Sequence, residues 1–132
     1  MIKGSCCCGA VQFELLAEPS MMGTCHCTRC RKVGASQMVF VKRAGPRWIA
    51  GRDQVQLYAP VPPYQYGRCF CRHCGTALGE ILSEGDSFPI AAHALDGEFA
   101  VRNSFHEFVS EKPAWSEICD GAKQFAGHPV AG

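Results

Sequence analysis

The chain has 132 residues, a formal net charge of +1, a hydrophobic fraction of 47% and a charged fraction of 19%. This length fits one domain that can bury a core, so we expect a single domain over residues 1–132. The small net charge and the lack of any block of like charges argue against a nucleic-acid partner.

Nothing in the sequence indicates export or membrane insertion. The first five residues contain no apolar signal-peptide core, and no apolar run has the length of a membrane-spanning helix. Disulfide frameworks belong mainly to exported proteins, so the ten cysteines fit reduced, metal-binding thiolates better. We therefore expect a cytoplasmic protein with no membrane partner.

Short strand-like segments follow one another along the chain. The first covers residues 11–15, where Val11, Phe13 and Leu15 alternate with polar residues, as in a half-buried strand. The other strand candidates, bounded by glycine, proline or aspartate turns, are residues 38–41, 48–49, 55–58, 64–71, 76–82, 88–95 and 103–109. This pattern predicts an all-β domain.

The sequence predicts little helix and a C-terminal tail without regular structure. Helical turns are expected only after Cys30 and near Trp115. The glycine-rich end of the chain predicts a loose tail after about residue 125.

Seven of the ten cysteines have spacings typical of metal ligands, namely Cys6-x-Cys8, Cys25-x-Cys27-x-x-Cys30 and Cys71-x-x-Cys74. On an extended segment, Cys6 and Cys8 point to the same side, so both can bind one metal ion. Cys71 and Cys74 have the spacing of a zinc knuckle, and Gly75 follows where a tight turn is needed. The two pairs together predict a closed, structural four-cysteine site.

Cys25, Cys27 and Cys30 form a second set, for which no fourth cysteine is reserved. Catalytic zinc sites have three protein ligands and leave one position open for water or a substrate. This set therefore predicts a reactive centre.

Three further cysteines leave other ligand sets open. The second set becomes structural if a fourth side chain closes it: Cys7, Cys69, Cys119 or a histidine. Another arrangement places Cys69 with Cys71, Cys74 and one N-terminal cysteine. If they bind no metal, Cys7, Cys69 and Cys119 are expected to be small, mostly buried residues.

At these motifs the chain resembles the glutathione-dependent formaldehyde-activating enzymes, a family grouped with centromere protein V. The resemblance runs from Gly4 to about Phe125, and several separated motifs occur in the same order. These are residues 4–11, 25–32 and 70–75, then Leu95-Asp96, and finally His106 with Lys112 and Trp115.

The resemblance implies a β-tent fold of short antiparallel sheets scaffolded by zinc. It implies a structural zinc on Cys6, Cys8, Cys71 and Cys74, and a second, catalytic zinc on Cys25, Cys27 and Cys30. The implied activity is condensation of glutathione with formaldehyde to S-hydroxymethylglutathione, which is a carbon–sulfur lyase reaction in reverse. A related thiol or another small aldehyde is a further candidate substrate.

Charged and aromatic residues are candidate substrate contacts. Arg29, Arg31 and Lys32 crowd the second cysteine set and suit the carboxylates of glutathione, or else they balance the negative charge of zinc thiolates. His106 and Trp115 are added by the family pattern.

The chemistry of zinc thiolates favours a thiol substrate over direct polarisation of an aldehyde. A soft thiol binds readily at such a zinc ion and loses its proton there.

We expect Arg68 and Arg72 to balance charge at the four-cysteine site, and His26, between two ligands, to point away from the metal. Two other functions stay open: a non-catalytic thiol carrier and a zinc-scaffolded interaction module.

Overall fold

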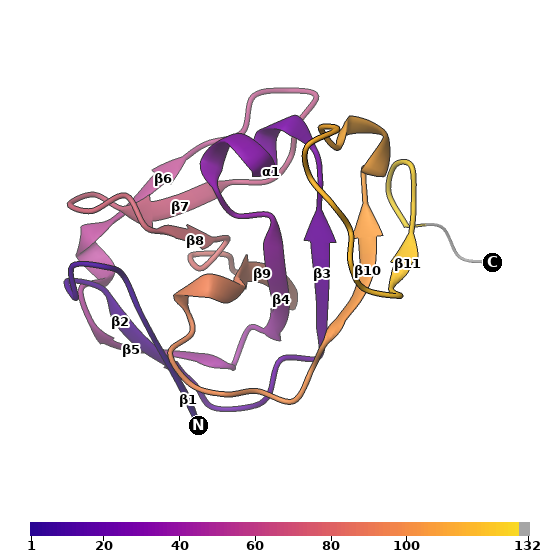
Figure 1. Ribbon diagram of the computed structural model, residues 1–132. Coiled ribbons are helices and arrows are strands. Elements are labelled where there is room, and N and C mark those ends of the chain that lie inside the picture. Colours follow the sequence, from indigo (N-terminus) through magenta and orange to yellow (C-terminus); the bar gives the residue numbers. More distant parts are fainter. Residues whose placement is uncertain (130–132) are drawn as a thin grey trace.

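The computed structural model describes residues 1–129, and three small sheets form its framework (Figure 1). The first sheet has the order β1 (Ile2–Ser5), β2 (Gln12–Leu15) and β5 (Pro46–Ala50). The second has the order β11 (Lys123–Gln124), β10 (Asn103–Glu107), β3 (Met21–Cys25), β4 (Gln37–Lys42) and β9 (Ser87–Ala91). The third has the order β6 (Val55–Tyr58), β7 (Arg68–Cys71) and β8 (Ala77–Gly79).

The predicted all-β fold of short antiparallel sheets with little helix is confirmed. The helical elements of residues 1–129 are α1 (Thr28–Val33) and the 3₁₀ turns η1 (Arg52–Gln54), η2 (Ala92–Ala94) and η3 (Val109–Glu111). Two pairings depart from the antiparallel pattern, because β10 runs parallel to both β3 and β11. No helix in this part of the chain is long and apolar enough to cross a membrane.

Side chains from all three sheets meet in one core. The largest fully buried ones are Phe13, Leu15, Leu78, Ile90, Val11, Val39 and Cys71. The alternation along β2 places Phe13 and Leu15 in this core, as predicted, and each such side chain contributes roughly 1.5–3 kcal/mol by leaving water. The neighbouring Gly4 leaves room for the Phe13 ring, since a Cβ on Gly4 would lie 2.3 Å from that ring. Glu14 is also buried, and Arg47 forms a salt bridge with it.

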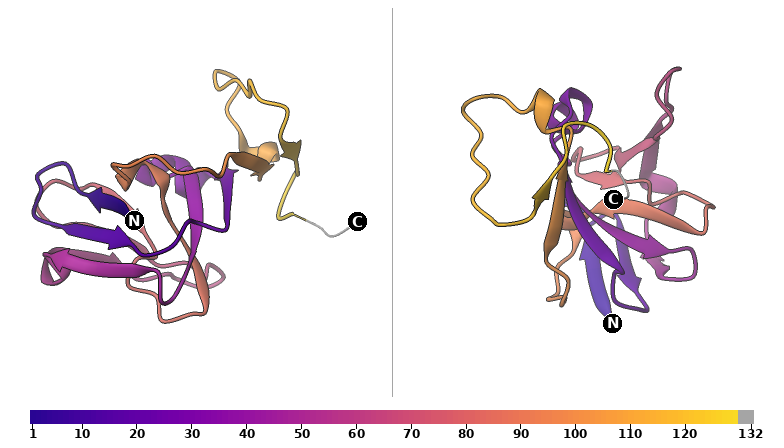
Figure 2. Two further views of the ribbon diagram at one scale, coloured as in Figure 1. Left: turned by 90° about the horizontal axis from the view of Figure 1, so that it is seen from below. Right: turned by 90° about the vertical axis from the view of Figure 1, so that its right-hand side faces the viewer.

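The C-terminal part extends to one side of the molecule (Figure 2). Residues 112–122 form a long loop between η3 and β11. Beyond it, the Phe125 N–H donates to the His106 carbonyl at 2.8 Å and the Phe108 N–H donates to the Gly127 carbonyl at 3.0 Å. The tail that we expect to be loose after about residue 125 thus begins in contact with β10. Its last residues, 130–132, lie outside the described residues.

Candidate metal centres and the adjoining pocket

The four-cysteine cluster has the spacing of a tetrahedral metal site. The Sγ of Cys6 lies 3.6 Å from that of Cys8, and the Sγ of Cys8 lies 3.8 Å from that of Cys71. With Cys74 included, all four sulfurs lie within 4.8 Å of one another. Zn–S bonds of about 2.3 Å in a tetrahedron separate the sulfurs by about 3.8 Å. The cluster therefore fits zinc both in its donor atoms and in its size.

Each cysteine pair of this cluster lies in a tight turn that ends at a glycine. Gly9 has a φ of 80° and Gly75 a φ of 77°, a left-handed conformation that glycine adopts without strain. The Gly9 N–H donates to the Cys6 carbonyl at 3.1 Å, and the Gly75 N–H donates to the Cys71 carbonyl at 2.9 Å. The extended conformation predicted around Cys8 is wrong, because residues 7 and 8 form a turn. The turn nevertheless brings both sulfurs to the same side.

Neutral donors surround the sulfurs of the four-cysteine cluster. The Val11 N–H donates to Cys6 Sγ at 3.2 Å, and the His73 N–H donates to Cys71 Sγ at 3.4 Å. The Thr76 hydroxyl lies 3.1 Å from Cys74 Sγ, and its hydrogen bond lowers the pKa of the Cys74 thiol to about 5. These bonds favour the thiolate, which is the form of cysteine that binds metal.

The three-cysteine cluster lies where β3 passes into α1. Cys25 is the last residue of β3, and Cys30 lies inside the helix. Cys27 caps α1, because its Sγ accepts a hydrogen bond from the Cys30 N–H at 3.3 Å. The three sulfurs lie within 4.8 Å of one another, and within residues 1–129 no fourth histidine, cysteine or carboxylate belongs to the group. This cluster could hold a metal ion that keeps one coordination position free of these protein ligands.

The remaining cysteines lie outside both clusters. Cys69 is buried in the core with 3% of its surface exposed, as expected. Cys7 and Cys119 are exposed, so the expectation that they are buried is wrong. The turn after β1 and the 112–122 loop place them at the surface.

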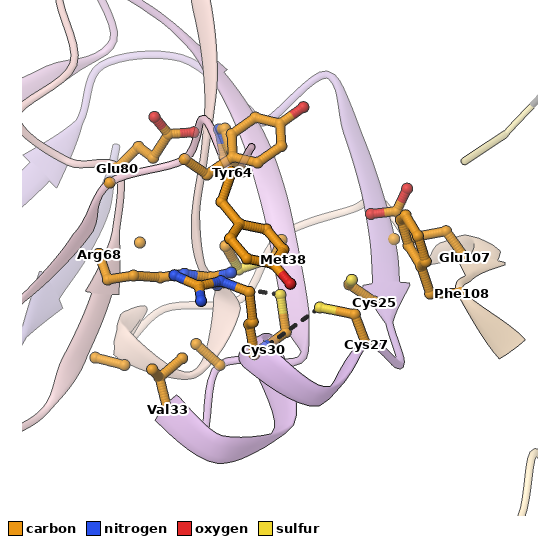
Figure 3. A pocket seen from close by; sticks show the side chains of 18 of the residues that line it. Cys25, Cys27, Cys30, Val33, Met38, Tyr64, Arg68, Glu80, Glu107 and Phe108 are labelled. Carbon is orange, nitrogen blue, oxygen red and sulfur yellow. Dashed lines mark hydrogen bonds between the residues drawn. The ribbon is translucent and has the colours of Figure 1, made fainter. Parts of the chain in front are cut away.

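A positive charge contacts the three-cysteine cluster directly. Arg68 extends from β7 toward it (Figure 3), and its Nη1 donates a hydrogen bond to Cys30 Sγ at 3.1 Å. Hydrogen bonds from Cys25 and from Arg68 lower the pKa of Cys30 to about 5, whereas the hydrogen bond with Cys30, together with burial, raises the pKa of Cys25. The expectation that Arg68 serves the four-cysteine site is wrong. Residues three apart on a strand, such as Arg68 and Cys71, point to opposite faces.

The three-cysteine cluster lines a cavity of about 1180 Å³. On the wall of this cavity the Arg29 guanidinium lies over the Tyr64 ring, 3.9 Å from the ring centroid. The Nε atoms of Arg29 and Arg68 are buried and have no hydrogen-bond partner within the described residues. Glu80 also lines the cavity (Figure 3), and burial raises the pKa of its carboxyl group. The cavity thus combines sulfur ligands with cationic groups that have unused donors.

The predicted substrate residues separate into two groups. Arg29 and Lys32 line the cavity, whereas Arg31, His106 and Trp115 are not among the described residues that line it. Arg31 is exposed on α1, and Trp115 is 77% exposed on the 112–122 loop.

His106 belongs to a hydrogen-bonded chain outside the cavity. Its Nδ1 lies 2.8 Å from His26 Nε2, and its Nε2 lies 2.8 Å from the Asp120 carboxylate. The His106 hydrogen bond is the main reason why the pKa of Asp120 is lowered, and burial lowers the pKa of His26. His26 thus bonds to β10, as expected for a residue that points away from the ligands. Sequence reasoning missed Asp120, because no motif links it to His106.

Together, the small sheets and the two cysteine clusters define a cysteine-rich β protein with two groups of residues that could hold metal ions. A family model described as glutathione-dependent formaldehyde-activating enzyme matches residues 1–111. The chain belongs to this family, so the resemblance read from its motifs is confirmed.

Individual relatives agree with the family. The chain is 27% identical over 143 residues to a Halomonas elongata protein named "Putative glutathione-dependent formaldehyde-activating enzyme", with 98% of this chain and 89% of that one covered. It is 28% identical over 124 residues to a Schizosaccharomyces pombe protein named as an uncharacterized lyase, with 93% and 89% covered. A crystal structure of a Rhodobacter sphaeroides protein is similar, with a TM-score of 0.58 and 28% identity over 73% of this chain and 89% of that one. These findings support an enzyme of the lyase class.

Proposed function

We propose that this protein joins a small thiol to a small aldehyde and catalyses the reverse carbon–sulfur cleavage, with glutathione and formaldehyde as the first pair to test. One observation carries the proposal. Three cysteine sulfurs line a large cavity, and no fourth histidine, cysteine or carboxylate within residues 1–129 completes their group. Such a centre can accept a ligand from outside the protein.

In this proposal the two clusters have different roles. The four-cysteine cluster holds a structural zinc ion that links the N-terminal turn to the end of β7. Cys25, Cys27 and Cys30 would hold a zinc ion, which would supply a soft coordination position that favours the thiolate form of a thiol. The protein works in the cytoplasm, where thiols stay reduced.

The groups on the cavity wall act on the rest of the substrate. Arg29 and Lys32 bind the carboxylates of glutathione, and the Tyr64 ring holds the Arg29 guanidinium flat against the wall. The thiolate sulfur donates its electron pair to the carbonyl carbon and forms the carbon–sulfur bond. The carbonyl π electrons move to oxygen, which takes up the proton that the thiol released. Arg31, His106 and Trp115 have no part in this scheme.

The test compares rates at equal free glutathione. We expect the protein to accelerate formation of S-hydroxymethylglutathione above the spontaneous rate, followed by NMR of the hydroxymethyl signal. Cys119→Ser is the matched control, because Cys119 is exposed and lies outside both clusters. Saturable glutathione binding without acceleration would identify a thiol carrier instead of an enzyme.

A further inference from the structure

The two clusters differ in the charge of their hydrogen-bond donors. Within the described residues, Arg68 is the one charged side chain that hydrogen-bonds to a sulfur of either cluster, through its Nη1 and Cys30 Sγ at 3.1 Å. The four-cysteine sulfurs receive bonds from the backbone N–H groups of Val11 and His73 and contact the Thr76 hydroxyl, all neutral groups. Of the two clusters, the one that opens into the cavity therefore receives a hydrogen bond from a fully charged side chain.

Three other charged groups that line this cavity are engaged with other partners. The Glu107 carboxylate pairs with His128 at 3.6 Å, and the Glu111 carboxylate accepts hydrogen bonds from the Thr28 N–H and hydroxyl at 3.1 Å. The Arg29 guanidinium is stacked on Tyr64. Arg68 keeps a buried Nε–H that no described residue accepts. Within the described residues, Arg68 is therefore the cation in direct hydrogen-bond contact with the sulfurs of this cluster.

We infer that Arg68 is a positioning residue that makes the three-cysteine centre prefer a thiolate over a neutral molecule as its outside ligand. This inference rests on the proposed function of that centre. Three thiolates around a divalent zinc ion leave a single net negative charge, and a substrate thiolate adds a second. In a partly buried site this added charge is costly unless a cation lies close by. A neutral water molecule, alcohol or thioether adds no charge, so Arg68 gives it no such help.

Two substitutions at Arg68 and one matched control separate this role from a general effect of charge. Arg68→Gln removes the charge, and Arg68→Lys keeps it while losing the planar donor group. Arg72→Gln removes the same charge from an exposed residue of the loop between Cys71 and Cys74. Arg72 donates no side-chain hydrogen bond to a sulfur, since Arg68 alone among charged side chains does so in the described residues.

The experiment measures ligand binding with cobalt(II) in place of zinc. A new thiolate at the metal strengthens the thiolate-to-cobalt charge-transfer absorption, so glutathione binding is read without turnover. S-methylglutathione has the same carboxylates and no ionisable thiol, so its affinity reports the contacts of the peptide portion. Cobalt content and circular dichroism establish that each variant is loaded and folded.

We expect Arg68→Gln to weaken glutathione binding by roughly 10- to 100-fold, the range for losing a hydrogen bond to a charged group. S-methylglutathione affinity should stay unchanged, and Arg72→Gln should behave as the parent protein does. Equal loss for both ligands would contradict the inference, as would unchanged glutathione binding, while leaving the proposed function intact. A parent protein whose charge-transfer band does not respond to glutathione would overturn both. If Arg68→Gln does not load the second cobalt ion, Arg68→Lys takes its place as the test. Because this variant keeps the charge, it should still prefer glutathione over S-methylglutathione, and loss of that preference would refute the inference.

Discussion

The four-cysteine cluster joins distant parts of the chain, whereas the three-cysteine cluster lies within six consecutive residues, Cys25 to Cys30. The first holds two glycine-ended turns together, and within residues 1–129 the backbone and hydroxyl groups that contact its sulfurs are all neutral. The second lies on a strand–helix junction beside a cavity and contacts a guanidinium group. Cysteine side chains thus form two clusters in different surroundings, one that links distant turns and one that opens into a cavity.

The largest expected effect tests whether the four-cysteine cluster is needed for folding. Cys71→Ser should leave the chain largely unfolded, because Cys71 is fully buried and its sulfur is one of the four that could hold the structural metal ion. Binding at structural zinc sites contributes on the order of 10 kcal/mol, which is comparable to the whole stability of a domain. Circular dichroism and zinc content per chain measure this. Cys7→Ser, in the same region but exposed, is the control, and parent-like thermal unfolding of Cys71→Ser would refute the assignment.

A smaller effect on the fold, with a large effect on activity, is expected at the second cluster. Cys27→Ser should lose the second zinc ion and the acceleration of thiol–aldehyde addition. Serine is a favourable N-cap, so it can replace the cap that Cys27 gives α1, and the contribution of this cap to stability should change by only about 1 kcal/mol or less. Zinc counting, thermal unfolding and the rate assay report the three properties. Unfolding as severe as that of Cys71→Ser would remove the distinction between the clusters.

The smallest effect concerns the cavity wall and depends on pH. Burial raises the pKa of Glu80 from its ordinary value of 4.5, so the unfolded chain releases this proton at lower pH than the folded chain does. Stability due to Glu80 is therefore present below pH 4.5 and is lost as the pH rises through the folded pKa. Glu80→Gln should raise the free energy of unfolding slightly at neutral pH.

Urea unfolding at two pH values checks this prediction. The gain from Glu80→Gln should vanish below pH 4.5, where the carboxyl group is protonated in both states. Glu84→Gln is the control, because Glu84 is exposed. A gain that is the same at both pH values would show that charge burial is not its cause.

The cysteine positions were predictable because ligand spacing is a local property of the sequence. The spacings identified both clusters, and the alternation of Val11, Phe13 and Leu15 identified β2 with its core face. The contact of Arg68 with Cys30 was not predictable, because it depends on which face of β7 opens into the cavity. That orientation follows from the pairing of Tyr58 with Arg68, which joins residues ten apart in the sequence.

The hydrogen-bonded chain of His26, His106 and Asp120 was also not predictable, because it joins residues far apart in the sequence. The parallel pairing of β10 with β3 sets Thr24 opposite His106, and the 112–122 loop then brings Asp120 to the other side of that imidazole. Neither hydrophobic periodicity nor turn residues specify a parallel pairing or the path of a long loop. The strand β3 itself was missed, because Gly23 interrupts its apolar pattern. A Cβ at Gly23 would lie 2.2 Å from the Phe105 ring, so packing rather than propensity selects glycine there.

β7 connects the two clusters within four residues. At one end Arg68 contacts the three-cysteine cluster, and at the other end Cys71 belongs to the four-cysteine cluster. At about 3.3 Å per residue, the two ends lie roughly 10 Å apart on a stiff, doubly paired strand. One short strand thus carries both a cysteine of the closed cluster and the guanidinium that contacts the open one. Zinc starvation would therefore abolish thiol capture through the fold, because the strand that presents Arg68 would unfold together with the cluster at its other end.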